Sequence, residues 1–169
     1  MPFDPAAYGP VFPQLIPADR RRALDEGQPV ANVRDALDSL SVSTAFSGRA
    51  VTDLAMAQAC LAGVWLVSDY LDESHTLSQA IPTREGSFWH GIMHRREGDY
   101  SNAKYWFRRV GEHPVFEQLA AQFGEWDPYD FVDRCQQAVR SGSGAEGCLV
   151  RQQAEWERLF DWCYDHAVG

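Results

Sequence analysis

Apolar residues recur every three to four positions between Arg49 and Asp69, where they form two stripes along a predicted helix. One stripe consists of Ala57, Cys60, Val64, Val67 and Leu71, and the other of Leu54, Leu61 and Trp65. A helix that is apolar around most of its circumference is typical of an element surrounded by other elements. We therefore expect residues 49–69 to form the central helix of the fold.

Further segments with helical spacing follow, separated by glycine or proline. They predict helices over residues 73–80, 85–97, 101–110, 115–123, 128–140 and 148–166, and two short helices over 18–26 and 33–40. Thr83 or Ser87 is expected to cap residues 85–97, and Gly98 to end them. Residues 39–47 and 141–147 are rich in serine or glycine and are expected to be loops. No segment alternates with the period of two that is typical of strands. The pattern predicts an all-α fold, a single compact domain of about seven helices around residues 49–69.

Residues 1–17 differ from the rest of the chain because they contain five prolines. Proline fixes the backbone and removes a hydrogen-bond donor, so we expect an extended N-terminal arm. Its aromatic residues Phe3, Tyr8 and Phe12 indicate that the arm lies against the helical domain, residues 18–169.

The net charge of the 169-residue chain indicates which kinds of molecule it is expected not to bind. Its net charge is −9, whereas nucleic acids and anionic membranes require a basic face, so we expect neither as a partner. The longest apolar stretch, residues 54–71, is interrupted by Gln58, Ser68 and Asp69, which favours a buried helix over a membrane span. The four cysteines are widely spaced and the N-terminus lacks a signal-peptide pattern. These features predict a cytoplasmic protein with reduced thiols and no cysteine-based zinc site.

Two central segments are related by an offset of 30 residues: Asp69-Tyr70 aligns with Asp99-Tyr100, and Leu77 and Ala80 align with Phe107 and Val110. The second copy carries Gly91, Gly98, Tyr100, Ala103, Phe107 and Pro114. This spacing resembles the tetratricopeptide helical hairpin, well over one copy and poorly over the other. The segment also resembles one found in a family of uncharacterised proteins. Repeat arrays need at least three copies, so the resemblance implies a packing mode of helix pairs and no activity.

Histidines and carboxylates concentrate around the turn at Pro82. A short connection between residues 73–80 and 85–97 makes the two helices antiparallel neighbours. His75 is then expected to face His90, and Asp72 and Glu73 to approach His94. His90 and His94 lie four residues apart and share one face of their helix.

Three interpretations of this constellation stay open. The first is a buried hydrogen-bond network. The second is a site in which His75, His90 and His94 with one carboxylate bind a divalent transition metal. The third is an acid–base pocket without metal. Arg95, Arg96 and Arg108 either bracket an anionic ligand or pair with acids on the surface.

The first functional hypothesis is a His/carboxylate pocket that binds a small molecule, anionic or not, with or without a divalent metal. The rival is a non-enzymatic interaction module whose tetratricopeptide-like hairpins hold a partner peptide. The sequence has no phosphate loop, nucleophile elbow or dinucleotide fingerprint, so we name no catalytic residue.

Overall fold

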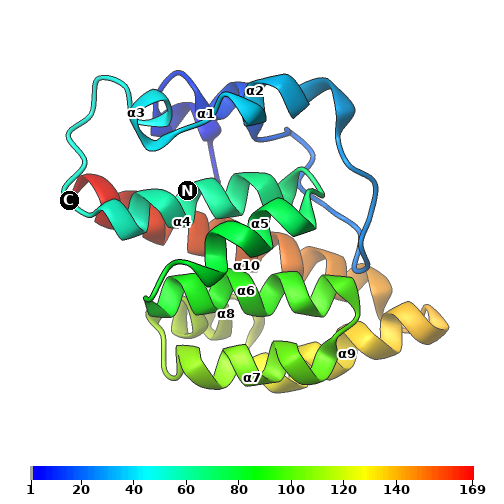
Figure 1. The fold of residues 1–169 in the computed structure, drawn as a ribbon. Helices are drawn as coiled ribbons and strands as arrows, with labels where there is room; N and C mark the ends of the chain where they lie inside the picture. The colour runs from blue at the N-terminus through cyan, green and yellow to red at the C-terminus, as the bar shows by residue number, and fades with distance from the viewer. Residues whose placement is uncertain (1) are drawn as a thin grey trace.

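The computed structural model describes residues 2–169, so Met1 of the expected arm lies outside the described residues. These residues form ten α-helices and two 3-10 helices, and no strand occurs among them, which confirms the all-α prediction. The helices are α1 Phe12–Leu15, α2 Arg34–Asp38, α3 Val42–Ala45, α4 Leu54–Val67, α5 Leu71–Gln79, α6 Arg84–Glu97, α7 Tyr100–Val110, α8 Pro114–Phe123, α9 Pro128–Ser141 and α10 Ala145–Val168 (Figure 1). Ten α-helices are three more than the expected seven, and the three shortest, α1, α2 and α3, have only four or five residues each.

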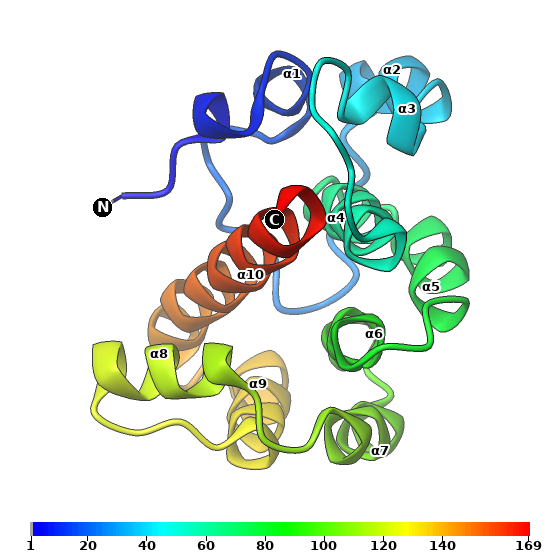
Figure 2. The same ribbon diagram turned by 90° about the vertical axis from the view of Figure 1, so that its left-hand side faces the viewer.

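Helices α4 and α10 lie side by side at the centre of the domain (Figure 2). The sequence predicted this role for α4, whose residues from Ala59 onward are all buried. The helix begins later than expected, at Leu54, because the Asp53 carboxylate accepts the N–H of Met56 at 3.1 Å and caps it there. Helix α10 joins the core through Trp156, whose indole N–H donates to the carbonyl of Gly63 at 2.8 Å.

Helices α4 to α7 follow one another as neighbouring antiparallel elements (Figure 1). Thr83 caps α6, and Gly98 ends it with a left-handed φ of 86°, both as predicted. Gly91 permits α6 and α7 to approach closely, because a Cβ at this position would lie 3.1 Å from the Phe107 ring. The resemblance of this helix pair to the tetratricopeptide hairpin stays a prediction.

The N-terminal residues pack on the domain but are not extended. A 3-10 helix, Pro5–Tyr8, and α1 replace the expected arm, because Asp4 caps the first and proline occupies an early position in both. Tyr8 and Phe12 are buried, and each packs edge-on against Phe160. The expected contact between the arm and the domain is therefore confirmed, whereas the extended conformation is wrong.

Two further local predictions are wrong. Residues 18–26 are not helical; Arg20, Arg21 and Arg22 instead bind carboxylates of distant elements, at Glu157, Glu146 and Asp69. The expected loop 39–47 contains α3, because Ser41 and Thr44 form a reciprocal capping box.

None of the helices in residues 2–169 combines the length and apolar character that crossing a bilayer requires. Cys60, Cys135, Cys148 and Cys163 are buried free thiols.

Candidate functional site

Three histidine side chains meet between α5 and α6, as the antiparallel turn at Pro82 predicts. The ring of His75 from α5 lies 4.6 Å from that of His90 and 5.3 Å from that of His94, both on α6. The His90 and His94 rings stack, with centroids 4.6 Å apart and an interplanar angle of 17°. His75 stands nearly perpendicular to both of them. The expected contact between His75 and His90 is therefore confirmed.

One ring nitrogen from each histidine lies within 4.8 Å of the other two. His90 and His94 come from one helix face at a spacing of four residues, and His75 supplies the third nitrogen from the neighbouring helix. His90 and His94 are buried, whereas His75 is half-buried. The three nitrogens thus surround one small volume with one wall near the surface.

His90 is the unusual member of this cluster. It is 2 % exposed, and neither ring nitrogen has a hydrogen-bond partner among residues 2–169. Its ring lies between His94 and Trp106, stacked on the indole at 3.8 Å. Burial, followed by the neighbouring His94 and His75, lowers the pKa of His90 to about 3, so the imidazole is neutral at pH 7. A neutral imidazole with a free lone pair is the form that binds metal ions.

His94 has a carboxylate partner, but not one of the two that we expected. Its Nδ1 lies 2.5 Å from Oε1 of Glu97, three residues further along α6. Glu73 instead accepts a hydrogen bond from Arg34 at 2.5 Å, and Asp72 is exposed. The helix geometry explains the difference, because residues three apart lie on the same face. The spacing of His94 and Glu97 was visible in the sequence and would have given the correct partner.

The second contact of His94 is polar. The amide nitrogen of Asn102, on α7, lies 3.2 Å from Nε2 of His94. Because Glu97 occupies Nδ1, Nε2 is the nitrogen that the amide can donate to. Asn102 was not among the residues that the sequence singled out, since the register between α6 and α7 is needed to place it.

The arginines that we expected near the cluster do not form an anion site there. Arg95 is fully buried and makes a two-pronged ion pair with Glu155 of α10, at 2.6 and 3.1 Å. Arg96 is buried against Asp69, with Nη2 and Oδ1 2.7 Å apart. Arg108 is exposed on α7. Successive positions of α6 point about 100° apart, so residues 94, 95 and 96 face different neighbours.

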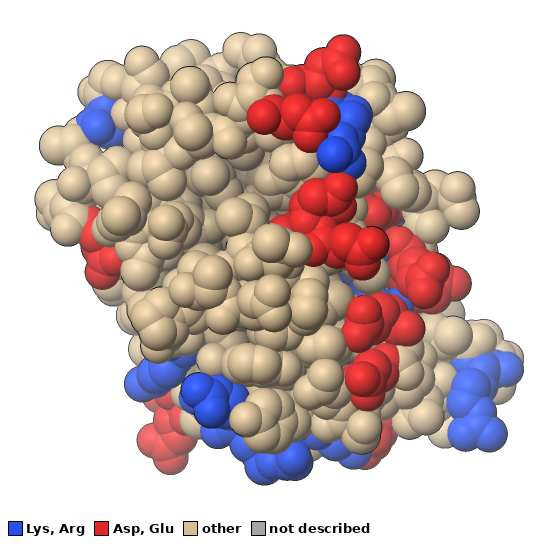
Figure 3. Space-filling view, in the orientation of Figure 1, with Lys and Arg blue, Asp and Glu red and all other residues tan. Residues whose placement is uncertain are grey.

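The surface beside the cluster is acidic. A hollow of about 460 Å³ next to Tyr70 is lined by Glu26, Asp72, Glu73 and Glu97. Acidic side chains form a band down one side of the face in Figure 3. Glu97 connects the hollow to the histidine cluster, because it lines the hollow and also binds His94. The histidine cluster therefore adjoins a surface that attracts cations.

Comparison of the chain with protein-family models, with curated proteins and with solved structures found no match.

Proposed function

We propose that the protein binds a divalent transition-metal ion through His75, His90 and His94. The observation that carries the proposal is His90, a buried neutral imidazole whose nitrogens have no partner in the described chain. A buried polar group without a hydrogen bond costs about 1–3 kcal/mol. A metal bond would satisfy one of the two ring nitrogens of His90, the one that carries the lone pair.

The geometry of the three rings suits such an ion. Zinc–nitrogen bonds of about 2.0–2.1 Å in a tetrahedral site place the ligand nitrogens about 3.4 Å apart. The nitrogens lie within 4.8 Å of one another and therefore have to close by at most roughly 1.4 Å on binding. His75 is half-buried on α5, whereas His90 and His94 are buried, so the movement is assigned to His75. Imidazole ligands suit zinc, iron, copper and nickel, and a fourth position stays open to water or a small ligand.

Glu97 and Asn102 would act around the metal rather than on it. The Glu97 carboxylate fixes the proton of His94 on Nδ1 and leaves the Nε2 lone pair available, an arrangement that raises the basicity of metal-binding histidines. The Asn102 amide now occupies that lone pair at 3.2 Å. Metal binding at Nε2 therefore requires Asn102 to turn away.

The two other interpretations account less well for His90. A closed hydrogen-bond network leaves it without a bond among residues 2–169, although it satisfies His94 through Glu97. An acid–base pocket needs a group whose pKa lies near the working pH, whereas the pKa of His90 is lowered to about 3.

The test uses untagged protein and Co²⁺, whose visible absorption reports nitrogen coordination. We expect one Co²⁺ per chain, displaced by Zn²⁺, with the absorption lost in His75→Ala and in His90→Leu. If His90→Leu folds poorly, His75→Ala still tests the site, because His75 is half-buried and its replacement disturbs the core less. His166→Ala is the matched control, since this exposed histidine lies on α10 and contacts Trp162.

Folding of each variant is checked by circular dichroism. Wild-type protein that takes up no Co²⁺, or binding that survives in both His75→Ala and His90→Leu, would refute the proposal.

A further inference from the structure

Two of the four buried cysteines lie together, away from the main core. Helices α9 and α10 contact each other and are joined by residues 142–144 alone, so their facing sides meet. Cys135 of α9 and Cys148 of α10 are hydrogen-bonded to each other through their thiols. The small cluster of buried apolar residues around them, separate from the main core, also contains Leu24, Phe131 and Ala138.

Cys148 has the surroundings of a reactive thiol. It closes the first turn of α10, and helical side chains point back toward the N-terminus, where free backbone N–H groups favour a negative charge. The hydrogen bond with Cys135 is the main cause that lowers the pKa of Cys148 to about 7, although burial opposes it. A substantial fraction of Cys148 is therefore thiolate at neutral pH, the form that attacks disulfides.

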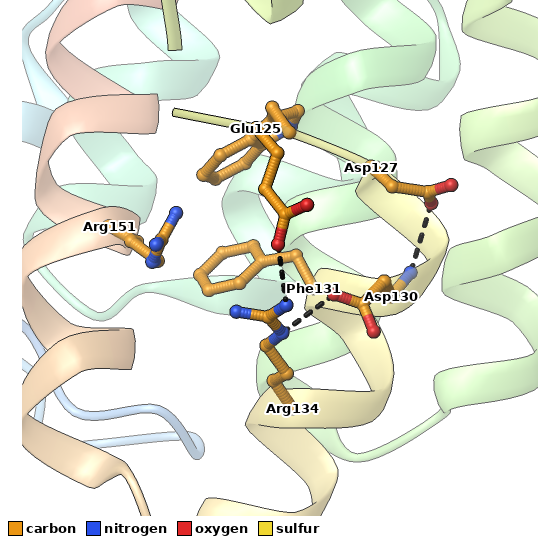
Figure 4. Close-up of a pocket in the computed structure, with 7 residues that line it drawn as sticks. Glu125, Asp127, Asp130, Phe131, Arg134 and Arg151 are labelled. Carbon is orange, nitrogen blue, oxygen red and sulfur yellow. Dashed lines mark hydrogen bonds and ion pairs between the residues drawn. The ribbon is translucent and has the colours of Figure 1, made fainter. Parts of the chain in front are cut away.

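Arginines near Cys148 act in the same direction as this hydrogen bond. Positive charges that lower the pKa of Cys148 come from Arg95, Arg134 and Arg151. Figure 4 shows Arg134 on α9 and Arg151 on α10 on either side of one hollow. Carboxylates partly offset two of these charges, since Glu155 pairs with Arg95, and Asp130 and Glu125 pair with Arg134. The arginines thus support the thiolate, and the hydrogen bond is the larger contribution.

Cys135 differs from Cys148 although the two thiols are in contact. Its exposure is 0 %, against 5 % for Cys148, and it lies in the middle of α9 rather than at a helix end. The hydrogen bond with Cys148 and burial both raise the pKa of Cys135. Cys135 therefore keeps its proton and donates it in a hydrogen bond to the Cys148 thiolate. The pair combines one nucleophilic sulfur with one protonated thiol beside it, as redox-active dithiols require.

A small molecule reaches Cys148 when the first turn of α10 opens. Gly144, which precedes the turn, provides no side-chain cap. Within the turn, Glu146 and Gly147 are exposed and Ala145 is only half-buried. Helix ends with little buried surface open locally at a low cost in free energy. The 5 % exposure of Cys148 in the closed helix is therefore not a barrier to slow reaction.

The other two cysteines have opposite properties and provide an internal control. Cys60 and Cys163 are 0 % exposed and lie in the main core. Burial raises the pKa of each thiol well above its ordinary value. Both are expected to stay unreactive under conditions in which Cys148 reacts.

We propose that Cys135 and Cys148 form a reversible disulfide by exchange with a small-molecule disulfide. The Cys148 thiolate attacks one sulfur of that molecule, breaks its S–S bond and releases one small thiolate. Cys135 then gives its proton to water and attacks the Cys148 sulfur of the mixed disulfide, which releases the second small thiolate. The two protein thiols are oxidised, and the small disulfide is reduced to two thiols that take up the two protons. The new bond joins the uncapped start of α10 to the middle of α9.

The experiment treats the folded protein with oxidised glutathione in the presence of a metal chelator. Samples are quenched with acid, alkylated with iodoacetamide in denaturant and mapped by mass spectrometry. We expect a disulfide between Cys135 and Cys148 that dithiothreitol reverses, whereas Cys60 and Cys163 are recovered as alkylated thiols.

Two variants separate the roles of the two sulfurs. In Cys135→Ser, the mixed disulfide with glutathione should persist on Cys148, because no second thiol displaces it. In Cys148→Ser, glutathione should add to Cys135 at least tenfold more slowly than it adds to Cys148 in Cys135→Ser. Cys60→Ala is the matched control, since it removes a buried thiol of the main core and should form the same disulfide at the wild-type rate. Circular dichroism checks the folding of each variant.

Three results would each overturn the proposal. They are the absence of a Cys135–Cys148 disulfide in the folded wild-type protein, modification of Cys60 or Cys163 as fast as that of Cys148, and equal rates in Cys148→Ser and Cys135→Ser. The wild-type measurement needs no substitution, so it decides the question even if a variant folds poorly. The chelator keeps the outcome independent of metal binding at the histidine cluster.

Discussion

The buried ion pair between Arg95 and Glu155 gives a sharp test of how this core is held together. Both side chains have an exposure of 0 %, and two hydrogen bonds of 2.6 and 3.1 Å join them. The Arg95 guanidinium also lies 4.5 Å from the ring centroid of Phe131. We predict that Glu155→Gln, which keeps the shape and removes the charge, strongly destabilises the protein.

The magnitude follows from the burial of the group that remains. Removing one partner of a buried pair leaves an uncompensated charge and costs about 3–5 kcal/mol. Replacing both partners by apolar residues of similar volume is often neutral or stabilising by about 1–4 kcal/mol. We therefore expect the double variant Arg95→Met, Glu155→Leu to recover at least the stability that Glu155→Gln loses.

Urea unfolding followed by tryptophan fluorescence measures both effects. Arg21→Gln is the control, because the pair of Arg21 with Glu146 is exposed and its loss should cost less than about 1 kcal/mol. A cost for Glu155→Gln as small as that of the control would refute the reasoning, as would a double variant less stable than the single one. The double variant should also retain Co²⁺ binding, since Arg95 faces α10 and not the histidine cluster.

Two further predictions concern packing and acid stability. Gly63→Ala should lower the free energy of unfolding in urea by about 1–3 kcal/mol, because the added Cβ would lie 2.7 Å from the buried Trp89 ring. Burial opposes ionisation of Glu85, but hydrogen bonds, chiefly from His113, outweigh it and lower its pKa from 4.5 to about 2. The ionised carboxylate therefore contributes up to about 3 kcal/mol to the free energy of unfolding above pH 4.5, and this contribution is lost as the pH falls towards 2. In Glu85→Gln, the free energy of unfolding should change less with pH across this range.

Helix positions were predictable from the sequence wherever local signals agreed with the hydrophobic pattern. For α6, Thr83 was one of two candidate caps and Gly98 the expected end, and the structure has Thr83 as the cap and ends the helix before Gly98. Residues 18–26 show the opposite case. Their helical appearance depended on a few residues; the segment is non-helical, and its Arg20, Arg21 and Arg22 pair with distant acids. Those acids lie more than forty residues away along the chain, so the spacing of residues within 18–26 does not predict the pairs.

The histidine cluster was predictable for a simple geometric reason, and its surroundings were not. A tight turn forces antiparallel packing, and this placed His75 opposite His90. The partner of His94 is Glu97, three residues further along the same helix, and it was missed because the acids across the turn, Asp72 and Glu73, were preferred. Of the two alternatives left open for Arg95 and Arg96, pairing with acids is the one that the structure has, although the acids are buried rather than on the surface. The peptide-binding module also stays a prediction.

His90 differs from the buried charged residues at the end of helix α6. At the end of this helix, His94, Arg95 and Arg96 point to three different neighbours, and each finds an acidic partner, at Glu97, Glu155 and Asp69 respectively. The fold thus supplies a partner for every buried charged group at this end of α6. His90, one turn earlier, lies equally deep and has none in the described chain. Trp89 Nε1 and Arg95 Nε on the same helix also lack a hydrogen-bond partner among residues 2–169. His90 differs from them because both of its ring nitrogens are unpartnered and two further histidines lie beside it, which is the arrangement that a metal ion would use.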